Sequence, residues 1–133
     1  MMSMSSEAVV TFADGLPGFE TCRRFILVKS GAIDPFTVVQ GLDGAAPPSF
    51  VAIEPHRIEQ GYRSTLDRSD LDRLQAADGH PLLWLALVAA QPDGSATVNL
   101  RAPLVINPSS MRGIQLLPVE SDYSVSVPLP VAS

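Results

Sequence analysis

The chain has 133 residues, of which 46% are hydrophobic and 17% charged, enough apolar material for one packed core and too much for a disordered polypeptide. Fourteen acidic and nine basic residues give a formal net charge of −5, which opposes binding to phosphate backbones and suits a basic protein partner. No apolar run reaches the roughly 18 residues of a membrane span, and the first six residues have neither the cationic nor the apolar region of a secretory signal. We therefore expect a cytoplasmic protein of one domain over residues 1–133, with an ordered core at about 8–128 and flexible ends at 1–7 and 129–133.

Twelve prolines and nine glycines, spread along the chain, divide it into short segments in the way that is typical of β-rich folds. Between the first two segments, Leu16-Pro17-Gly18-Phe19 predicts a type II turn, because proline fixes φ at the second position and glycine supplies a positive φ at the third. We expect the flanking Phe12 and Phe19 to pack in the core or at its rim. Apolar runs bounded by turn residues predict the first four strands, at Ala8–Phe12, Arg24–Val28, Phe36–Gln40 and Ser49–Glu54.

One helix is predicted after these strands, over Asp70–Asp78. Ser69 and Asp72 have the spacing of a capping box, and Gly79 is placed to end the helix. Leu71 and Leu74 would then face the body of the protein. The helix residues expected to stay in water are Asp70, Asp72 and Arg73.

The run Leu82–Ala90 is apolar at odd and even positions, which indicates a strand covered on both faces, with Trp84 in the core. The turn sequence Gln91-Pro92-Asp93-Gly94 connects it to a strand at Ala96–Leu100, and the two predict a hairpin. Three more strands are predicted, at Leu104–Asn107, Ile114–Leu117 and Ser124–Val127. The fold class is thus all-β and mainly antiparallel, a small barrel-like or sandwich fold of about eight or nine short strands with one short helix.

The sequence offers little support for catalysis or for a cofactor. A cysteine nucleophile would have to pair Cys22 with His56 or His80, and neither histidine lies in a local signature for that role. We expect Cys22 to be a small packing residue, both histidines to be loop residues, and the protein not to be an enzyme. The spacing of these residues does not fit a zinc site, and no phosphate-binding glycine motif occurs, so neither metals nor cofactors are expected.

Two alternatives to a protein-binding function remain open at this point. A small β-barrel could bind RNA, although the basic residues are dispersed and the aromatic residues are few. A hydrolase that depends on Cys22 is the other alternative, and it rests only on the presence of a cysteine and two histidines.

Three stretches in order carry a family resemblance: Gly15-Leu16-Pro17-Gly18-Phe19-Glu20, then Asp34-Pro35-Phe36-Thr37-Val38-Val39-Gln40 with Asp43 after it, then Thr97-Val98-Asn99-Leu100-Arg101-Ala102-Pro103-Leu104-Val105-Ile106-Asn107. Together they resemble the flagellar assembly factor FliW family, over roughly Val9–Pro128. Gln115 and Tyr123 also fall where that family has a glutamine and a tyrosine.

The resemblance implies a cytoplasmic binding protein with an antiparallel, barrel-like fold. Members of the family bind flagellin and, in competition with it, the translational regulator CsrA, so that flagellin accumulation frees CsrA to repress flagellin translation. We expect the same two partners here, with no direct nucleic acid or membrane contact and a monomer in the free state. The residues proposed to contact a partner are Phe19, Glu20, Phe36, Asn99, Ala102, Pro103, Asn107, Gln115 and Tyr123.

Some of these residues also have structural interpretations. Asn99 could bond to a neighbouring backbone at a bulge or edge. Pro103 cannot donate to a ladder, so Ala102-Pro103 is expected at an edge, a bulge or a strand start, where it would either accept a partner's strand or prevent unwanted pairing. Two positions depart from the family pattern: Gly41 stands where a serine is frequent, and Ser126 where a basic residue is frequent. The tail from Val127 is apolar, so CsrA binding is less firmly implied than flagellin binding.

Overall fold

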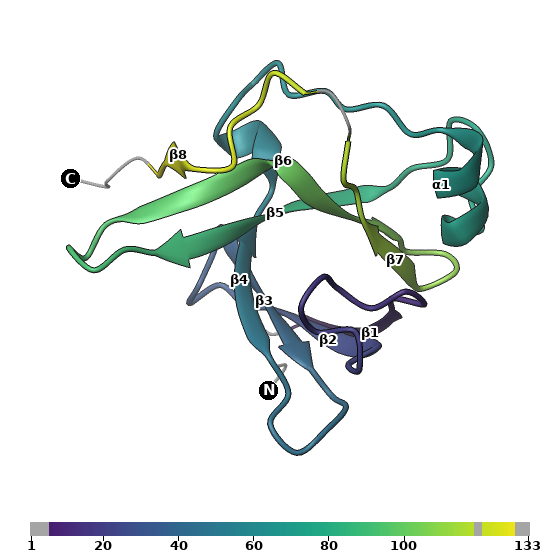
Figure 1. The fold of residues 1–133 in the computed structure, drawn as a ribbon, viewed down its shortest axis with the longest axis horizontal. Coiled ribbons are helices and arrows are strands. Elements are labelled where there is room, and N and C mark those ends of the chain that lie inside the picture. Colours follow the sequence, from purple (N-terminus) through teal and green to yellow (C-terminus); the bar gives the residue numbers. More distant parts are fainter. Residues whose placement is uncertain (1–5, 119–120, 130–133) are drawn as a thin grey trace.

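A computed structural model of the chain describes residues 6–118 and 121–129, in which short strands alternate with tight turns (Figure 1). Nearly every strand starts or ends within two residues of a predicted boundary, because proline, glycine and aspartate mark the turns. The elements are β1 Ser6–Thr11, β2 Arg24–Lys29, β3 Phe36–Gly41, β4 Ser49–Ile53, η1 Pro55–Arg57, α1 Arg68–Leu74, β5 Leu83–Ala90, β6 Ala96–Asn107, β7 Arg112–Gln115 and β8 Val127–Pro128.

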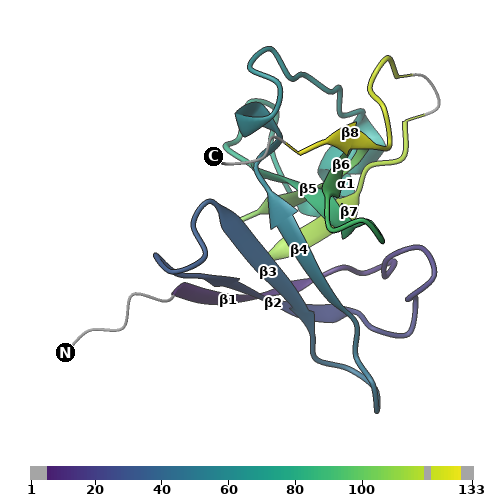
Figure 2. The ribbon, with the colours of Figure 1, turned by 90° about the vertical axis from the view of Figure 1, so that its left-hand side faces the viewer.

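Seven strands form a closed barrel in the order β5-β4-β3-β2-β1-β7-β6, and β6 pairs with β5 to complete the circle. Figure 2 shows β1 to β4 on one side of the barrel, with β5 to β8 and α1 on the other. All these pairs are antiparallel except β1 with β7, which is parallel and joins Thr11 to Arg112. The predicted all-β, mainly antiparallel, barrel-like class is confirmed, and the sandwich alternative is wrong because the sheet closes on itself.

The core fills the barrel with side chains from alternate strand positions, as the pleat requires. Phe12 lies directly after β1 and is fully buried. Its ring and that of Phe25 pack edge to face, with 5.5 Å between the ring centroids. The prediction that Phe12 packs in the core is therefore confirmed. The other large side chains of this cluster are Val10, Leu16, Leu27, Val39, Leu85, Leu104 and Ile106.

The two strands predicted at Ala96–Leu100 and Leu104–Asn107 are one twelve-residue strand, β6. The predicted hairpin is confirmed, because Ala90 pairs with Ala96 across the turn. The partner of Leu85 is Leu104, whereas that of Leu87 is Asn99, so several residues of β6 bulge out opposite one residue of β5. Pro103 lies in this bulge, which is one of the three positions predicted for it.

The helix α1 differs from its prediction at both ends. It begins at Arg68, and its capping box is formed by Asp67 and Asp70 rather than by Ser69 and Asp72: each carboxylate accepts a hydrogen bond from the other residue's backbone N–H, at 2.8 and 2.9 Å. The helix ends at Leu74 because Gln75 adopts a left-handed conformation with φ of 52°. Sequence reasoning missed this end because glutamine is rarely left-handed and Gly79 comes later.

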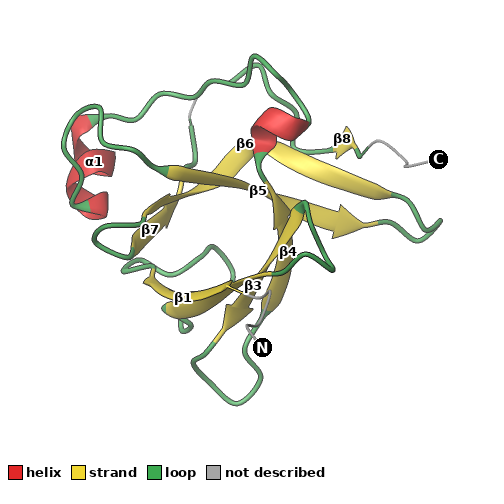
Figure 3. Ribbon diagram, turned by 180° about the vertical axis from the view of Figure 1, so that it is seen from behind, coloured by secondary structure: helices red, strands yellow, loops and turns green. Residues whose placement is uncertain are grey.

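The packing of α1 also corrects one expectation. Leu74 is fully buried and Leu71 half-buried, as predicted, whereas Asp70 is only 7% exposed rather than free in water. Its carboxylate is held by the helix N-terminus and by Arg73, whose Nη2 lies 2.6 Å from Oδ1. Burial of this acid is therefore compensated by hydrogen bonds and an ion pair. Figure 3 shows α1 on the outside of the barrel, away from η1.

The C-terminal segment runs back over β6. The strand predicted at Ser124–Val127 is reduced to the two residues of β8, while the Ser124 carbonyl accepts a hydrogen bond from Leu100 N at 3.1 Å. Within the two stretches predicted as flexible, β1 starts at Ser6 and Leu129 N donates to the Ala96 carbonyl. The remainder of those stretches, 1–5 and 130–133, lies outside the described residues. Within the described residues no helix has the length and apolar character to cross a bilayer.

Candidate functional site

The turn between β1 and β2 holds its residues rigidly. Phe19 N donates to the Leu16 carbonyl at 2.7 Å and Gly18 has φ of +85°, which confirms the predicted type II turn. Leu16 is buried and anchors the turn in the core. Gly15 packs so closely that a Cβ atom there would lie 2.7 Å from Glu20 Cα. The turn is therefore fixed by the burial of Leu16 and by the close packing of Gly15 against Glu20.

Phe19 is presented to solvent by this turn. Its side chain is 43% exposed, while its ring meets the edge of the half-buried Phe50 with 5.4 Å between ring centroids. It lies at the rim of the core rather than inside it, which was one of its two predicted positions. Phe50 was not singled out from the sequence, because a phenylalanine inside a strand looks like an ordinary core residue.

Glu20 follows Phe19 and is exposed as well. Its Oε2 accepts a hydrogen bond from Gly18 N at 2.9 Å, and this bond lowers the pKa of the Glu20 carboxyl below its ordinary value. The carboxylate thus keeps its negative charge near neutral pH and stays fixed relative to the turn. Phe19 and Glu20 thus present an exposed aromatic ring and an exposed carboxylate next to each other.

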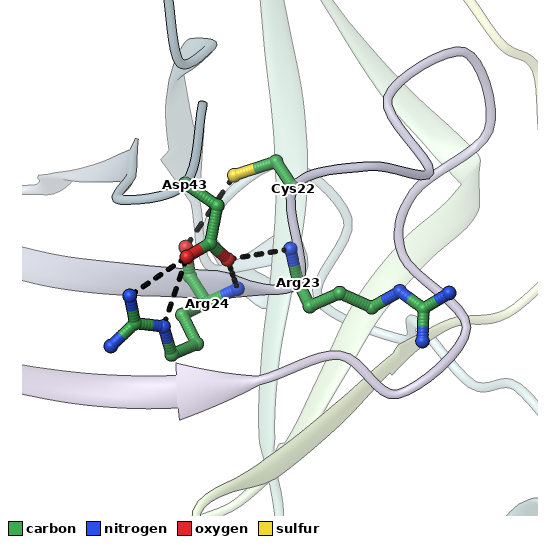
Figure 4. Close-up of polar contacts among 4 residues, drawn as sticks. All are labelled: Cys22, Arg23, Arg24 and Asp43. Atoms are coloured by element: carbon green, nitrogen blue, oxygen red, sulfur yellow. Dashed lines mark hydrogen bonds and ion pairs between the residues drawn. The ribbon is translucent and has the colours of Figure 1, made fainter. Parts of the chain in front are cut away.

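A second set of interactions fixes the loop after β3 against the start of β2 (Figure 4). The carboxylate of Asp43 accepts hydrogen bonds from the backbone N–H groups of Arg23 and Arg24, at 3.0 and 2.8 Å, and from the guanidinium of Arg24, at 3.0 and 2.8 Å. The Arg24 side chain, and then the two backbone donors, hold the pKa of Asp43 below its ordinary value of 3.8. Asp43 therefore has a structural explanation for its place in the motif.

The pKa of Asp43 gives a testable pH dependence. Because the folded-state pKa lies below 3.8, the stabilisation by the charged carboxylate is complete above pH 3.8 and is lost as the pH falls through the folded-state pKa. We expect Asp43→Asn to lower the free energy of unfolding at pH 7 and to reduce its loss at acidic pH. Urea unfolding at pH 7 and pH 3 measures both effects, with Asp72→Asn on the exposed side of α1 as the control. Equal acid sensitivity of wild type and Asp43→Asn would contradict this role.

Cys22 is a packing residue, as predicted. It is 2% exposed, and its thiol donates to the Arg24 carbonyl with 3.5 Å between Sγ and the oxygen. The neighbouring Gly41 has a packing reason too, since a Cβ atom there would lie 2.8 Å from Cys22 Sγ and 2.9 Å from the Pro48 carbonyl oxygen. A larger residue at position 41 would therefore displace Cys22 or Pro48, and the burial of Cys22 keeps its thiol away from solvent.

The two histidines lie outside the strands. His56 is in η1, a short 3-10 helix missing from the sequence prediction, and His80 is in a loop with its Nε2 3.2 Å from Ser109 Oγ. In the described part of the chain, no three His, Cys, Asp or Glu side chains are grouped closely enough to hold a metal ion.

Four of the predicted contact residues, Asn99, Ala102, Pro103 and Gln115, meet at the bulge of β6. The Oδ1 atom of Asn99 accepts hydrogen bonds from the backbone N–H groups of Arg101 and Ala102, both at 3.0 Å, while Gln115 Nε2 donates to the Ala102 carbonyl at 3.1 Å. The structural interpretation of Asn99 is thus confirmed. Pro103 is buried, and its carbonyl accepts from Leu116 N at 2.9 Å. The expectation that a partner's strand could add at Ala102-Pro103 does not fit, because β7 already occupies that side.

Asn107 has a structural role that sequence reasoning missed. Only 1% of it is exposed, and its Nδ2 donates to the carbonyls of Leu74 and Gln75 at 3.0 and 3.2 Å, while its Oδ1 accepts from Ser109 N at 2.9 Å. Its amide therefore satisfies the open C-terminal carbonyls of α1 and holds the helix on the barrel. Asn107 could contact a partner only if α1 moved away from the barrel.

The remaining two candidates lie apart from the turn. Phe36 is half-buried at the start of β3, where it borders an apolar surface groove together with Val51, Val88 and Leu129. Tyr123 stacks on Tyr62 with 4.6 Å between ring centroids, and its hydroxyl accepts from Arg63 N at 2.9 Å. The nine predicted residues thus do not form one site: Phe19, Glu20 and Gln115 are near the turn and β7, and the others are structural or distant.

A hollow of about 140 Å³ lies between the turn and β7. Glu20 and Gln115, far apart in the sequence, both line it, and so does Arg73 of α1. Arg73 is paired with Asp14 at 3.2 Å as well as with Asp70. Sequence reasoning did not find this arrangement, since a parallel β1–β7 pair gives no local signal.

Comparisons with known proteins agree with the fold and the motifs. The family model described as FliW protein matches residues 1–129. The flagellar assembly factor FliW of Natranaerobius thermophilus is 32% identical over 131 residues, covering 96% of this chain and 85% of that protein. That of Treponema pallidum is 35% identical over 115 residues, covering 86% of this chain and 75% of that protein. A crystal structure of the flagellar assembly factor FliW aligns with a TM-score of 0.79 at 30% identity, over 90% of this chain and 84% of the other.

Proposed function

The chain belongs to the FliW family of flagellar assembly factors, and from this premise we propose that it is a cytoplasmic, single-domain protein that binds flagellin and, in competition with flagellin, the translational regulator CsrA. The observation that carries the proposal is the exposure of Phe19 on a rigid turn. A large aromatic side chain held in water by a fixed backbone loses little conformational freedom when a partner covers it. Glu20 beside it adds a charge with a fixed position.

Competition between the two partners would make the protein a regulator of flagellin synthesis. Two ligands that exclude each other lower each other's apparent affinity by the same factor. Flagellin that has accumulated would thus displace CsrA, and CsrA would then repress flagellin translation until flagellin is exported. The net charge of −5 supports capture of a basic RNA-binding protein, chiefly through the encounter rate.

Binding to flagellin and CsrA encoded in the same genome tests the proposal directly. We expect each protein to bind the pure chain at micromolar concentration or below in isothermal titration calorimetry, and we expect added flagellin to release bound CsrA. Failure of both proteins to bind at micromolar concentration would overturn the proposal. Binding of both at once, without displacement, would remove the competitive part of it.

Phe19→Ala tests the turn. We expect the variant to fold normally, because Phe19 is at the rim of the core, and to bind flagellin at least about thirtyfold more weakly, as for an aromatic residue central to an interface. Val9→Ala is the matched control, since Val9 is 45% exposed on β1, outside the turn and outside the groove beside Phe36. Equal flagellin affinity of Phe19→Ala and Val9→Ala would show that the turn is not the contact.

A further inference from the structure

The barrel closes through a short contact, and β7 continues beyond it. The only register pair between β1 and β7 in the described residues is Thr11 with Arg112, where Thr11 N donates to the Met111 carbonyl at 2.9 Å. After Thr11 the chain bends away at Phe12, whose carbonyl accepts from Gly15 N. Strand β7 continues to Gln115, so the segment after Thr11 and the segment after Arg112 diverge. We call the space between these two segments the fork. We call the side of residues 113–117 that faces away from β6 the β7 edge.

Backbone groups on the β7 edge are free to pair. Leu116 N donates to Pro103 O on β6, and hydrogen-bonded pairs alternate along an antiparallel ladder, so the backbone N–H and C=O of Ile114 also face β6 while those of Gln115 face away from it. Among the described residues, no strand pairs with β7 on that side beyond Arg112. The backbone N–H and C=O of Gln115 therefore point into the fork.

The hollow of about 140 Å³ occupies this fork. One wall is the β7 edge, and the other is the turn, with Gly15, Pro17 and Glu20. At the open end Leu117 is 61% exposed, more than any other large apolar side chain of the described residues. A free strand edge, a hollow and an exposed leucine thus lie together, whereas proteins normally protect such an edge.

The charges around the hollow favour a cationic side chain. Asp14 and Glu20 both line it, while its arginine, Arg73, is already shared between Asp14 and Asp70. The hydrogen bond from Gly18 N lowers the pKa of Glu20 and so keeps that carboxylate charged. A phosphate or a carboxylate ligand would be repelled here, and a lysine or arginine would be attracted.

We propose that the β7 edge binds an extended segment of a protein partner, which adds a strand beside β7 and places a lysine or arginine at Asp14 and Glu20. A strand is the occupant that suits this edge, because free backbone donors and acceptors are satisfied by another backbone, whereas a helix has none to offer along its side. Apolar side chains of the segment would cover Leu117 and Pro17. This inference rests on the proposed protein-binding function and specifies how the partner would bind.

The test uses a capped synthetic peptide, Thr-Lys-Val-Lys-Val-Thr, titrated to millimolar concentration into the ¹⁵N-labelled protein and followed by NMR. We expect the amide signals of Gln115 and Leu117 to shift and the hydrogen exchange of Gln115 N–H to slow. The same peptide with glutamate in place of lysine should bind at least about tenfold more weakly. An unshifted Gln115 signal at saturating peptide, or equal binding of the two peptides, would overturn the proposal.

Two substitutions of Gln115 separate the contribution of its backbone N–H from that of its side chain. Gln115→Pro removes the N–H that faces the fork and leaves the β6–β7 ladder intact, whereas Gln115→Ala removes the side chain and keeps the N–H. We expect Gln115→Pro to bind the peptide about five- to tenfold more weakly than Gln115→Ala. If Gln115→Pro does not fold, the surface variant Asp14→Asn/Glu20→Gln decides, with an expected loss of at least about tenfold against Glu59→Gln as control. Unchanged peptide affinity in that variant would contradict the proposal.

The outcome is independent of the flagellin experiment. Flagellin binding without any peptide effect at Gln115 would leave the proposed function in place and refute the strand addition. A shift at Gln115 with the lysine peptide, in a protein that binds neither flagellin nor CsrA, would support the strand addition and refute the proposed function.

Discussion

Gly15→Ala is expected to lower the free energy of unfolding by about 2–4 kcal/mol and to weaken flagellin binding together with it. Gly15 has φ of +68°, where an alanine is strained, and a Cβ atom would lie 2.7 Å from Glu20 Cα and 2.9 Å from the Glu20 carbonyl oxygen. Both are backbone atoms, so the turn must open rather than a side chain rotate. Urea unfolding and calorimetric titration with flagellin measure the two effects.

Gly18→Ala is the matched control within the same turn. Gly18 also has a positive φ, of +85°, but no atom lies within 4 Å of the Cβ position. The substitution should therefore show only the conformational strain, about 1 kcal/mol, with little change in flagellin affinity. Equal destabilisation by the two substitutions would mean that the close approach of Gly15 to Glu20 does not define the turn.

Asn107→Ala is expected to destabilise the fold by about 3 kcal/mol, because it removes three hydrogen bonds made by a side chain that is 1% exposed, to the Leu74 and Gln75 carbonyls and from the Ser109 N–H. Chemical denaturation measures the loss, and hydrogen exchange should show that α1 opens before the barrel does. Binding of flagellin per folded molecule should stay unchanged, which separates a structural residue from a contact residue.

Ser110→Ala calibrates this effect. The Ser110 hydroxyl donates to the same Leu74 carbonyl at 2.8 Å, so its removal takes away one bond of the same kind and should lower the free energy of unfolding by about 1 kcal/mol. A loss for Asn107→Ala no larger than that for Ser110→Ala would show that α1 is held to the barrel mainly by Leu74 and its apolar neighbours.

Local signals in the sequence were sufficient for most of the fold. Proline, glycine and aspartate mark turns by their own backbone preferences, so the strands, the type II turn and the β5–β6 hairpin could be predicted. The errors have non-local causes. Pro103 interrupts an apolar run, so the sequence suggested two strands where the structure has one. The proline is tolerated because it lies in a bulge, and the bulge depends on the pairing with β5, which the local sequence does not show. Gln75 ends α1 in a left-handed conformation that its residue type does not indicate.

The candidate site was less predictable than the fold. Motif membership pointed to Asn99 and Asn107 as well as to Phe19, yet the asparagines bond to backbone groups and Phe19 faces water. A sequence motif does not separate residues that hold the fold from residues that a partner covers. The hollow beside Gln115 depends on a parallel pair between the first and seventh strands, and no local pattern predicts such a pair.

That pair also determines when the barrel can form during synthesis. Thr11 cannot meet Arg112 until most of the chain has left the ribosome, whereas β1 to β4 pair with their sequence neighbours and can assemble earlier. Strands β5 and β6 can also pair before β7 is made, so one side of β1 stays unpaired until the last part of the chain emerges. The late arrival of β7 is the event that covers this open edge and closes the barrel.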